Sequence, residues 1–361
     1  MSLDALRGFD MLFIVGADAL GRALAGLEGG PLIRFLAWQM EHAEWEGFRV
    51  YDLVFPLFVF VMGAAIPLSL DRMVAREGRG AAHRRVLVRG SVLYALGVIY
   101  YGGITEGWDN VRLVGVLQRL GFCYVATSLL YLHLRVRGLA VTTIALLVGY
   151  WALLTFVPVP GVGAGDFSRG RNLANWIDAH FLPLKVWYGD YDPEGLLSTL
   201  PSVASCLLGL FAGLWLRDPR RVGGRKVLCL AAAGAIAIGL GYGWALHFPV
   251  VKRIWTSSYV LVAAGWSALL LAGFSWAIDV RGWQRWAQPL LWVGTNALTI
   301  YLVSRFVDFD AIALIFLGGE IAAALNALWP GLAALVQALF GIVLCVLLCG
   351  FLFRRKIFLR L

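Results

Sequence analysis

The stretch from Tyr51 to Leu70, YDLVFPLFVFVMGAAIPLSL, decides the fold class. It is apolar over almost its whole length, and a helix of about 20 such residues can cross the hydrocarbon core of a bilayer. The connection that follows, 71–90, carries six arginines: Arg72, Arg76, Arg79, Arg84, Arg85 and Arg89. Because connections rich in arginine stay on the cytoplasmic side, the stretch predicts a membrane helix that ends at the cytoplasm.

The composition of the whole chain supports a membrane protein. Of 361 residues, 60% are apolar and 15% are charged, and the mean hydropathy is +0.76. Soluble domains have about 45 to 50% apolar and about 25% charged residues. The net charge of +9 is spread between apolar runs, as orientation signals are, so we expect no nucleic-acid partner. The five cysteines lie inside apolar runs without Cys-x-x-Cys spacing, so we expect buried hydrophobes and no metal site.

The charges of the connections between the apolar runs show which side of the membrane each connection lies on, and so limit the number of crossings. The connections 71–90 and 217–226 are basic and belong in the cytoplasm, whereas 26–50 and 158–195 hold more acids than bases and belong outside. The tail, with Arg354, Arg355, Lys356 and Arg360, also belongs inside, which requires an even number of crossings. Eleven runs are candidates: 5–25, 51–70, 86–102, 113–134, 139–157, 195–216, 227–247, 255–278, 289–306, 311–328 and 332–353.

The weakest candidate is 311–328, because Gly318, Gly319 and Glu320 interrupt it. We therefore expect 307–331 to be a re-entrant or interfacial segment. The predicted fold class is an all-α, polytopic integral membrane protein with about ten transmembrane helices and cytoplasmic N and C termini. We expect a single transmembrane domain over 1–361, with 158–195 as an extracytoplasmic loop.

The first apolar run carries an ionisable stripe. Its two acids Asp10 and Asp18 argue against a cleaved signal peptide, since a membrane helix can turn them towards a protein interior. At 100° per residue, Asp4, Arg7, Asp10, Asp18 and Arg22 fall within an arc of about 120°. Two interpretations stay open: a self-neutralised stripe that pairs Arg7 with Asp10 and Asp18 with Arg22, or the lining of a substrate path.

The segment EHAEWEGFRVYDLVFP, residues 41–56, is the sharpest local feature. It would lie at the outer membrane surface. His42 is either a solvated loop residue or a general base, because imidazole exchanges protons near neutral pH and neighbouring carboxylates can fix its tautomer. We interpret the other histidines, His83, His133, His180 and His247, as structural or solvated.

Two further polar groups could bind a ligand. Arg112 and Arg119 lie two turns apart on one helical face, where they either grip a phosphate or carboxylate or pair with Asp10 or Asp18. The outer loop holds Trp176, Trp187, Tyr188 and Tyr191 beside Asp190, Asp192 and Glu194. Such a mixture can bind a sugar, although an interfacial aromatic belt has the same composition.

Several motifs together resemble one family. They are LDALRG at 3–8, HAEWEG at 42–47, DLVFPLFVFVMG at 52–63, GVLQRLG at 115–121, DPEG at 192–195, KRIWTSSY at 252–259, TNA at 295–297 and RKIF at 355–358. In this order, over nearly the whole chain, they resemble the transmembrane acetyltransferases of the heparan-α-glucosaminide N-acetyltransferase family. The likeness is to its bacterial branch, which is associated with N-acetylglucosamine uptake.

The resemblance implies transfer of acetyl from cytoplasmic acetyl-CoA to an amino sugar on the opposite side, with His42 as the active-site base. Asp18 stands where the lysosomal member has Asn, and we expect it or a neighbouring acid to support His42. The extra luminal domain of the lysosomal member is not expected here, which favours a small sugar of the glucosamine type. The acceptor site is predicted to use Trp45, Asp52, Asp192, Glu194 and Asn296.

The CoA nucleotide is expected at the cytoplasmic mouth, since its phosphates need cations. The predicted cofactor-binding residues are Arg7, Arg72, Arg84, Arg85, Arg89, Gln118 and Arg119. His42 could act as base in direct transfer or carry the acetyl group itself, and we favour direct transfer because an acyl-imidazole facing water would hydrolyse. The expected partners are acetyl-CoA, the amino sugar or glycan acceptor and the lipid bilayer, and a homodimer is compatible with the sequence.

Two other classes of function stay open. An amino-sugar transporter would release unchanged sugar and would be expected to show inverted repeats, and no such repeat is visible in the sequence. A non-catalytic membrane scaffold would not need the ionisable stripe or His42. The Ala-, Gly-, Leu- and Arg-rich composition favours a bacterial plasma (inner) membrane.

Overall fold

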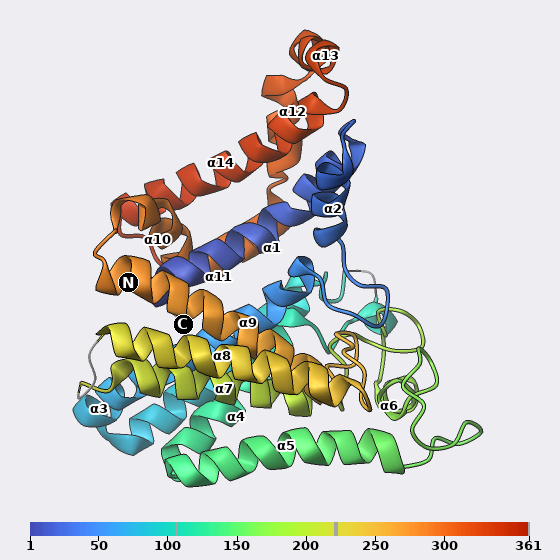
Figure 1. The fold of residues 1–361 in the computed structure, drawn as a ribbon, viewed down its shortest axis with the longest axis vertical. Helices are drawn as coiled ribbons and strands as arrows, with labels where there is room; N and C mark the ends of the chain where they lie inside the picture. The colour runs from blue at the N-terminus through green and yellow to red at the C-terminus, as the bar shows by residue number, and fades with distance from the viewer. Residues whose placement is uncertain (106, 220–222, 360–361) are drawn as a thin grey trace. The chain divides into compact units, whose positions relative to one another are not determined.

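The computed structural model describes residues 1–105, 107–219 and 223–359, and these are helices joined by loops (Figure 1). They form two compact units. The first unit holds Met1–Ala43, Arg49–Val54 and the described residues from Gly273 onward. The second unit holds Glu44–Phe48 and Phe55–Ala272. Three basic residues predicted to mark the cytoplasmic side, Arg220, Arg221 and Arg360, lie outside the described residues.

The first unit is built on the close packing of α1 against α10. A Cβ added at Gly8 would overlap the backbone of α10, and one added at Gly294 would overlap the backbone of α1, so both positions require glycine. Small residues of this kind let membrane helices approach closely. The helices of this unit are α1 (Ser2–Gly26), α2 (Pro31–Gln39), η1 (Val50–Leu53), η3 (Ser275–Val280), η4 (Arg285–Ala287), α10 (Gln288–Thr295), α11 (Ala297–Phe306), α12 (Phe309–Leu317), α13 (Gly319–Leu328) and α14 (Leu332–Arg354).

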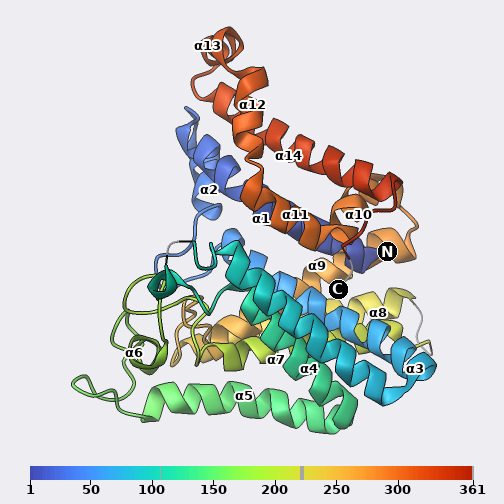
Figure 2. The ribbon, with the colours of Figure 1, turned by 180° about the vertical axis from the view of Figure 1, so that it is seen from behind.

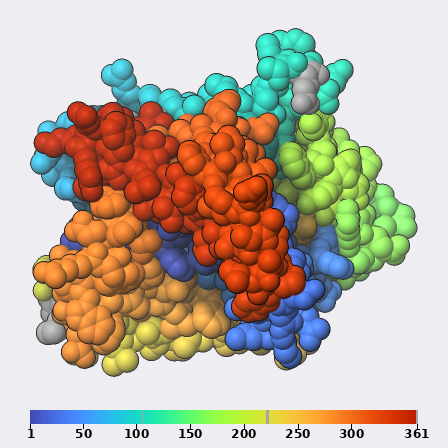
Figure 3. All heavy atoms as spheres, turned by 90° about the horizontal axis from the view of Figure 1, so that it is seen from above, coloured from blue at the N-terminus to red at the C-terminus, as the bar shows by residue number. Residues whose placement is uncertain are grey.

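Two apolar runs of the first unit are broken helices. The run 289–306 divides at Asn296, which joins α10 to α11 with φ −114° and ψ 20°. The run 311–328 divides at Gly318, where α12 and α13 bend by 83°. The atoms of this bent pair face the viewer in Figure 3. The bend fits either a broken span or a re-entrant loop, so the re-entrant or interfacial segment at 307–331 stays a prediction.

The second unit is a bundle in which α3 makes two arms. The residues 71–90, expected to be a connection, are helical, and the break is confined to Gly78 with φ 85°. The second arm packs along α4, because His83 contacts His133 at one end and Gly97 packs on Gln118 towards the other (Figure 2). The helices are α3 (Val54–Tyr100), η2 (Trp108–Asn110), α4 (Val116–His133), α5 (Val136–Phe156), α6 (Leu173–Phe181), α7 (Thr199–Arg217), α8 (Gly223–Ala245) and α9 (Ser257–Phe274).

Six helices of the described chain are long and apolar enough to cross a membrane, or seven if the bent pair is one span. They are Val50–Tyr100, Val136–Phe156, Thr199–Arg217, Gly223–Ala245, Ser257–Val280 and Leu332–Arg354. Helices α1 and α4 form as the sequence predicts, but their polar residues keep them out of this set. The all-helical class is therefore confirmed, while ten crossings and cytoplasmic termini stay predictions.

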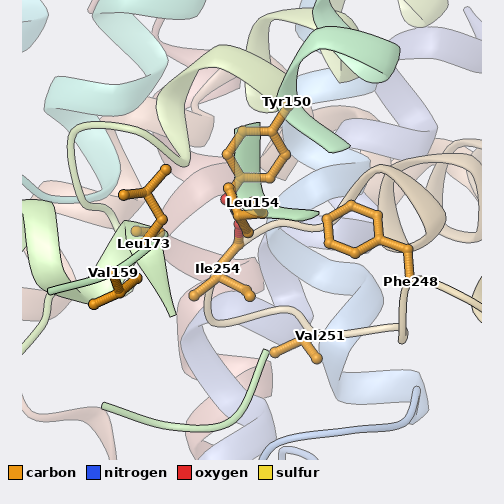
Figure 4. Packing of buried hydrophobic residues seen from close by; sticks show 8 residues of the cluster. Tyr150, Leu154, Val159, Leu173, Phe248, Val251 and Ile254 are labelled. Atoms are coloured by element: carbon orange, nitrogen blue, oxygen red, sulfur yellow. Dashed lines mark hydrogen bonds between the residues drawn. The ribbon is translucent and has the colours of Figure 1, made fainter. Parts of the chain in front are cut away.

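The predicted outer loop 158–195 is anchored by an apolar cluster of the second unit (Figure 4). Tyr150 and Leu154 of α5 pack there with Leu173, the first residue of α6. The segment 248–254 contributes Phe248, Val251 and Ile254, and the Tyr150 hydroxyl donates to the carbonyl oxygen of Ile254. These contacts hold α6 in place, and α6 carries Asp178, which is buried.

Candidate active site

His42 lies between α2 and η1, where the first unit holds it against a buried carboxylate. Its Nδ1 is 2.9 Å from Oδ1 of Asp52. The Asp52 side chain is 0% exposed, whereas that of His42 is 38% exposed. The other carboxylate oxygen, Oδ2, accepts the backbone N–H groups of Ala43 and Arg49, each at 3.1 Å. Asp52 therefore fixes both the histidine and the backbone at residues 43 and 49, which lie between His42 and Asp52 in the chain.

The Asp52 contact selects the tautomer of His42. An ionised carboxylate only accepts hydrogen bonds, so the ring proton resides on Nδ1 and Nε2 is the basic nitrogen. The same arrangement orients the histidine of serine-protease triads. Asp52 was predicted to bind the acceptor. In the structure its carboxylate contacts His42, the proposed base, and its part in acceptor binding stays a prediction.

Tyr51 links His42 to the ionisable stripe of α1. Its ring stacks on the His42 ring with centroids 4.3 Å apart and planes 4° apart. Its hydroxyl donates to Oδ1 of Asp18 at 2.7 Å. Asp18 thus reaches the predicted base through Tyr51, a residue that was not among the predicted site residues. The one available signal was its position beside Asp52 in the 41–56 segment.

The expected self-neutralised stripe of α1 does not form. Arg7 donates to Asp4 at 3.1 Å, and Arg22 lies 3.9 Å from Asp310. Asp10 is 1% exposed, and neither of its carboxylate oxygens has a hydrogen-bond partner in the described chain. The pairing of Arg7 with Asp10 and of Asp18 with Arg22 is therefore wrong, because Arg7 meets Asp4 one turn earlier in α1 and Arg22 meets Asp310 of α12.

Trp45 belongs to the second unit. Its Nε1 donates to the carbonyl oxygen of Phe167 at 2.9 Å, and its ring meets that of Tyr191 edge-on. Two residues later, the Gly47 N–H donates to the carbonyl oxygen of Val250. The motif HAEWEG therefore divides between the two units, with His42 and Ala43 in the first and the residues from Glu44 onward in the second.

Arg112 lies at the centre of a buried ionic cluster in the second unit. It is 3% exposed, and it donates from Nε and Nη2 to the two oxygens of Asp192 and from Nη2 to Glu194 at 2.6 Å. The rings of Tyr101 and Trp187 lie 4.4 and 4.5 Å from the guanidinium carbon. The alternative that paired Arg112 with Asp10 or Asp18 is wrong. The loop acids neutralise it instead, and burial raises the pKa of the Glu194 carboxyl.

Arg119 extends this cluster along α4. Its Nη2 donates to Ser198 and to the carbonyl oxygen of Gly195, and its carbon lies 5.0 Å from the Trp255 ring. Arg119 is 2% exposed, and its Nε and Nη1 have no hydrogen-bond partner among the described residues. These two buried nitrogens, which together carry three N–H groups, thus remain for a ligand or water, because an unmet buried donor costs about 1 to 3 kcal/mol.

The predicted cofactor residues do not form one group. His83 Nε2 lies 2.8 Å from His133 Nε2, which places the arginines 84, 85 and 89 near the C-terminal end of α4. Arg119 is 14 residues before His133, which is about 21 Å along the helix. Arg89 stacks on Tyr124, with 4.6 Å from its carbon to the ring centre. Arg84 and Arg85 are exposed, and Arg72, also exposed, donates to the carbonyl oxygen of Leu68.

Asn296 marks the break between α10 and α11. It is 1% exposed, and its Nδ2 donates to the carbonyl oxygen of Trp292 at 3.1 Å. Its Oδ1 has no hydrogen-bond partner among the described residues. The predicted acceptor residue is thus a buried amide at a helix break, with one acceptor atom left for a ligand.

Comparison with known proteins decides the family. The chain is 30% identical over 364 residues to heparan-alpha-glucosaminide N-acetyltransferase of Homo sapiens, covering 83% of this chain and 52% of that protein. It is 28% identical to the Mus musculus protein of the same name, covering 73% of this chain and 49% of that protein. The chain belongs to the heparan-alpha-glucosaminide N-acetyltransferase family. It spans about half the length of these curated relatives.

A family model described as a domain of unknown function, DUF5009, matches residues 1–101 of this family member. That range contains the whole His42, Tyr51, Asp52 and Asp18 group. The arginine cluster around Arg112 lies beyond it.

Proposed function

We propose that this chain is a transmembrane acetyltransferase that moves acetyl from cytoplasmic acetyl-CoA to a glucosamine-type amino sugar on the other side of the membrane. The observation that carries the proposal is the contact of His42 with the buried carboxylate of Asp52. The family membership supports the reaction class, and the apolar helices support the membrane setting. We propose a bacterial plasma membrane on composition alone.

The proposed chemistry is direct acyl transfer. Acetyl-CoA supplies a thioester, and the amine nitrogen of the sugar attacks its carbonyl carbon while the C–S bond breaks and the sulfur leaves with the electron pair. His42 Nε2 accepts the proton that the amine loses, and Asp52 stabilises the imidazolium through Nδ1. Stacking on Tyr51 keeps the ring in one plane during this transfer.

The arginines of α3 support a nucleotide site. Arg72, Arg84 and Arg85 are exposed, and Arg89 has a buried Nε without a partner among the described residues. Phosphate groups form strong, charge-assisted hydrogen bonds with arginine side chains. Arg119 and Gln118, about 21 Å along α4, would accompany the pantetheine arm and not the phosphates. Arg7, bound to Asp4 in the first unit, stays part of the proposed set.

The acceptor residues are proposed with different roles. Trp45 and Asn296 supply an aromatic surface and a buried amide oxygen. Asp192 and Glu194 act through Arg112, because Asp192 already accepts from its guanidinium and from two backbone N–H groups. A small amino sugar remains the proposed acceptor.

An amino-sugar transporter without chemistry is the second candidate. The helix breaks at Asn296 and Gly318 favour it, since transporters often place substrate at discontinuous helices. The buried Asp10, whose oxygens lack partners in the described chain, is a further feature of ion-coupled sites.

One experiment separates the two candidates. Purified protein in liposomes receives isotope-labelled acetyl-CoA on one side and glucosamine on the other, and mass spectrometry identifies the product. We expect labelled N-acetylglucosamine, and His42→Ala should reduce its formation about 10²- to 10⁴-fold. The matched control is His180→Ala, another outer-loop histidine, which should turn over normally. Unlabelled glucosamine released on the far side, without product, would favour the transporter.

A further inference from the structure

Helix α2 of the first unit carries its large apolar side chains on the side that faces away from the protein. It packs on α1 (Figure 1), and its buried residue is Ala37. The side chains that we call the α2 face, Leu32, Phe35, Leu36 and Trp38, are exposed. At 100° per residue these four fall within an arc of about 160°, opposite Ala37. Helices that face water show the reverse pattern, so the α2 face contacts lipid or an apolar ligand.

Helix α2 is too short to cross a membrane. It has nine residues, Pro31–Gln39, and is therefore about 14 Å long, less than half of a hydrocarbon core of about 30 Å. A helix of this length fits within one leaflet or along the membrane interface. His42 follows its last residue by three positions, so the proposed base comes directly after an apolar surface.

The end of α2 and the loop of the proposed base are joined by Arg49. Its guanidinium carbon lies 4.6 Å from the centre of the Trp38 ring, and its Nη1 is 3.4 Å from the carbonyl oxygen of Trp38. The backbone N–H of Arg49 donates to Asp52, whose other oxygen contacts His42. All these residues belong to the first unit, so the α2 face and the proposed base are parts of one compact body.

Polar and apolar groups meet at Trp38. On the polar side, His42 is partly exposed and the carboxylate of Glu41 is exposed. On the apolar side, the ring of Phe35 lies 6.0 Å from that of Trp38. Leu32 precedes Trp38 by six residues, so the apolar strip extends about 9 Å along the helix. A polar patch that continues into an apolar strip is complementary to an amphiphile, with a polar headgroup and a hydrocarbon chain.

We propose that the acceptor is an amino sugar carried on a lipid, with its sugar at His42 and its hydrocarbon chain along the α2 face. This inference deepens the proposed function and rests on it for the chemistry. A free sugar uses only the polar end and leaves the α2 face to bulk lipid. Because the chain lies away from the amine that reacts, it binds equally in the ground and transition states. It should therefore lower KM and leave kcat unchanged.

Photo-crosslinking locates the chain on the full protein in liposomes, without acetyl-CoA. The probe is octyl glucosaminide with a diazirine at the end of its chain. We expect label on peptides covering 31–40. Excess octyl glucosaminide should compete at about tenfold lower concentration than octyl glucoside, which has the same chain but no amine. Peptides of α5 report contact with bulk lipid, because Val141 and Ile144 are also exposed, and their label should not be competed.

Acetyl transfer to octyl and methyl glucosaminide then tests the consequence for the reaction. Replacing Leu32 and Phe35 together with serine should lower the octyl-to-methyl ratio of kcat/KM about tenfold, through KM and not kcat. The matched control replaces Val141 and Ile144 with serine, and it should keep the wild-type ratio. Partitioning of the octyl compound into the membrane is the same for all three proteins, so it cancels in the comparison.

Three outcomes would overturn the proposal. The label on 31–40 could resist competition as that on α5 does, which would show bulk lipid only. Octyl glucoside could compete as well as octyl glucosaminide, which would show a site that does not recognise the amine. The α2 variant could keep the wild-type ratio.

The crosslinking result needs no variant, so it holds even if the α2 variant fails to fold. Competed label on 31–40 without acetyl transfer to either acceptor would refute the proposed function and support the site for a lipid-carried amino sugar. Transfer to both acceptors without competed label would do the opposite. Failure of the inference and failure of the proposed function are therefore distinguishable.

Discussion

Replacing Asp52 with asparagine should disable the proposed base while leaving its shape intact. In the wild type, Oδ2 accepts two backbone N–H groups, from Ala43 and Arg49. In Asp52→Asn the amide oxygen must take that position, because an NH₂ group there would face two donors. The NH₂ group is then forced towards His42 Nδ1. It donates to Nδ1, so the ring proton moves to Nε2 and the basic nitrogen is lost.

The magnitude follows from the two interactions that change. In Asp52→Asn, returning the ring proton to His42 Nδ1 sets this N–H against the NH₂ group of the introduced amide, which costs about 1 to 3 kcal/mol. The imidazolium also loses a charge-assisted hydrogen bond worth about 1.5 to 3 kcal/mol. Together these costs are about 2.5 to 6 kcal/mol, so kcat should fall about 10²- to 10⁴-fold.

The assay is initial-rate formation of labelled N-acetylated sugar by wild type and Asp52→Asn, with acetyl-CoA affinity measured separately by equilibrium binding. Affinity should be unchanged. The control is Asp18→Asn, whose amide can still accept from the Tyr51 hydroxyl, and it should lose less than tenfold. If Asp52→Asn folds, binds acetyl-CoA and turns over within about threefold of wild type, the assignment of His42 as a base held by Asp52 is refuted.

Three further outcomes are expected. Tyr51→Phe keeps the ring stack and loses only the hydroxyl bond to α1, so turnover should fall less than tenfold, whereas Tyr51→Leu should lose more. Gly294→Ala forces a Cβ into the backbone of α1, so it should lower the free energy of unfolding by about 1 to 3 kcal/mol and with it the melting temperature. Gly273→Ala has open space around the added Cβ and should leave the melting temperature unchanged. Replacing Arg84 and Arg85 together with glutamine should weaken acetyl-CoA binding in an equilibrium assay. Unchanged affinity would move the nucleotide site elsewhere.

The sequence determined the helical class and the position of the long apolar helices, but not α2, α6 or the helical residues 71–90, which it predicted as connections. Apolar runs of membrane length can satisfy their backbone groups in lipid only as helices, so composition alone excludes most other folds. His42 could also be selected from the sequence, because a histidine beside acids and a family motif mark the same position. Asp52 was selected too, but for acceptor binding, since nothing in the local pattern shows which carboxylate meets the ring.

Only the tertiary structure decided the partners of the charged side chains. Arg112 and Asp192 are 80 residues apart, and Tyr51 and Asp18 are 33 apart. Helical spacing predicted Arg7 with Asp10 and Arg22 with Asp18, yet Arg7 meets Asp4 and Arg22 meets Asp310. Helix formation depends on local composition, which the sequence states directly, whereas the partner of a buried charge depends on how distant segments pack.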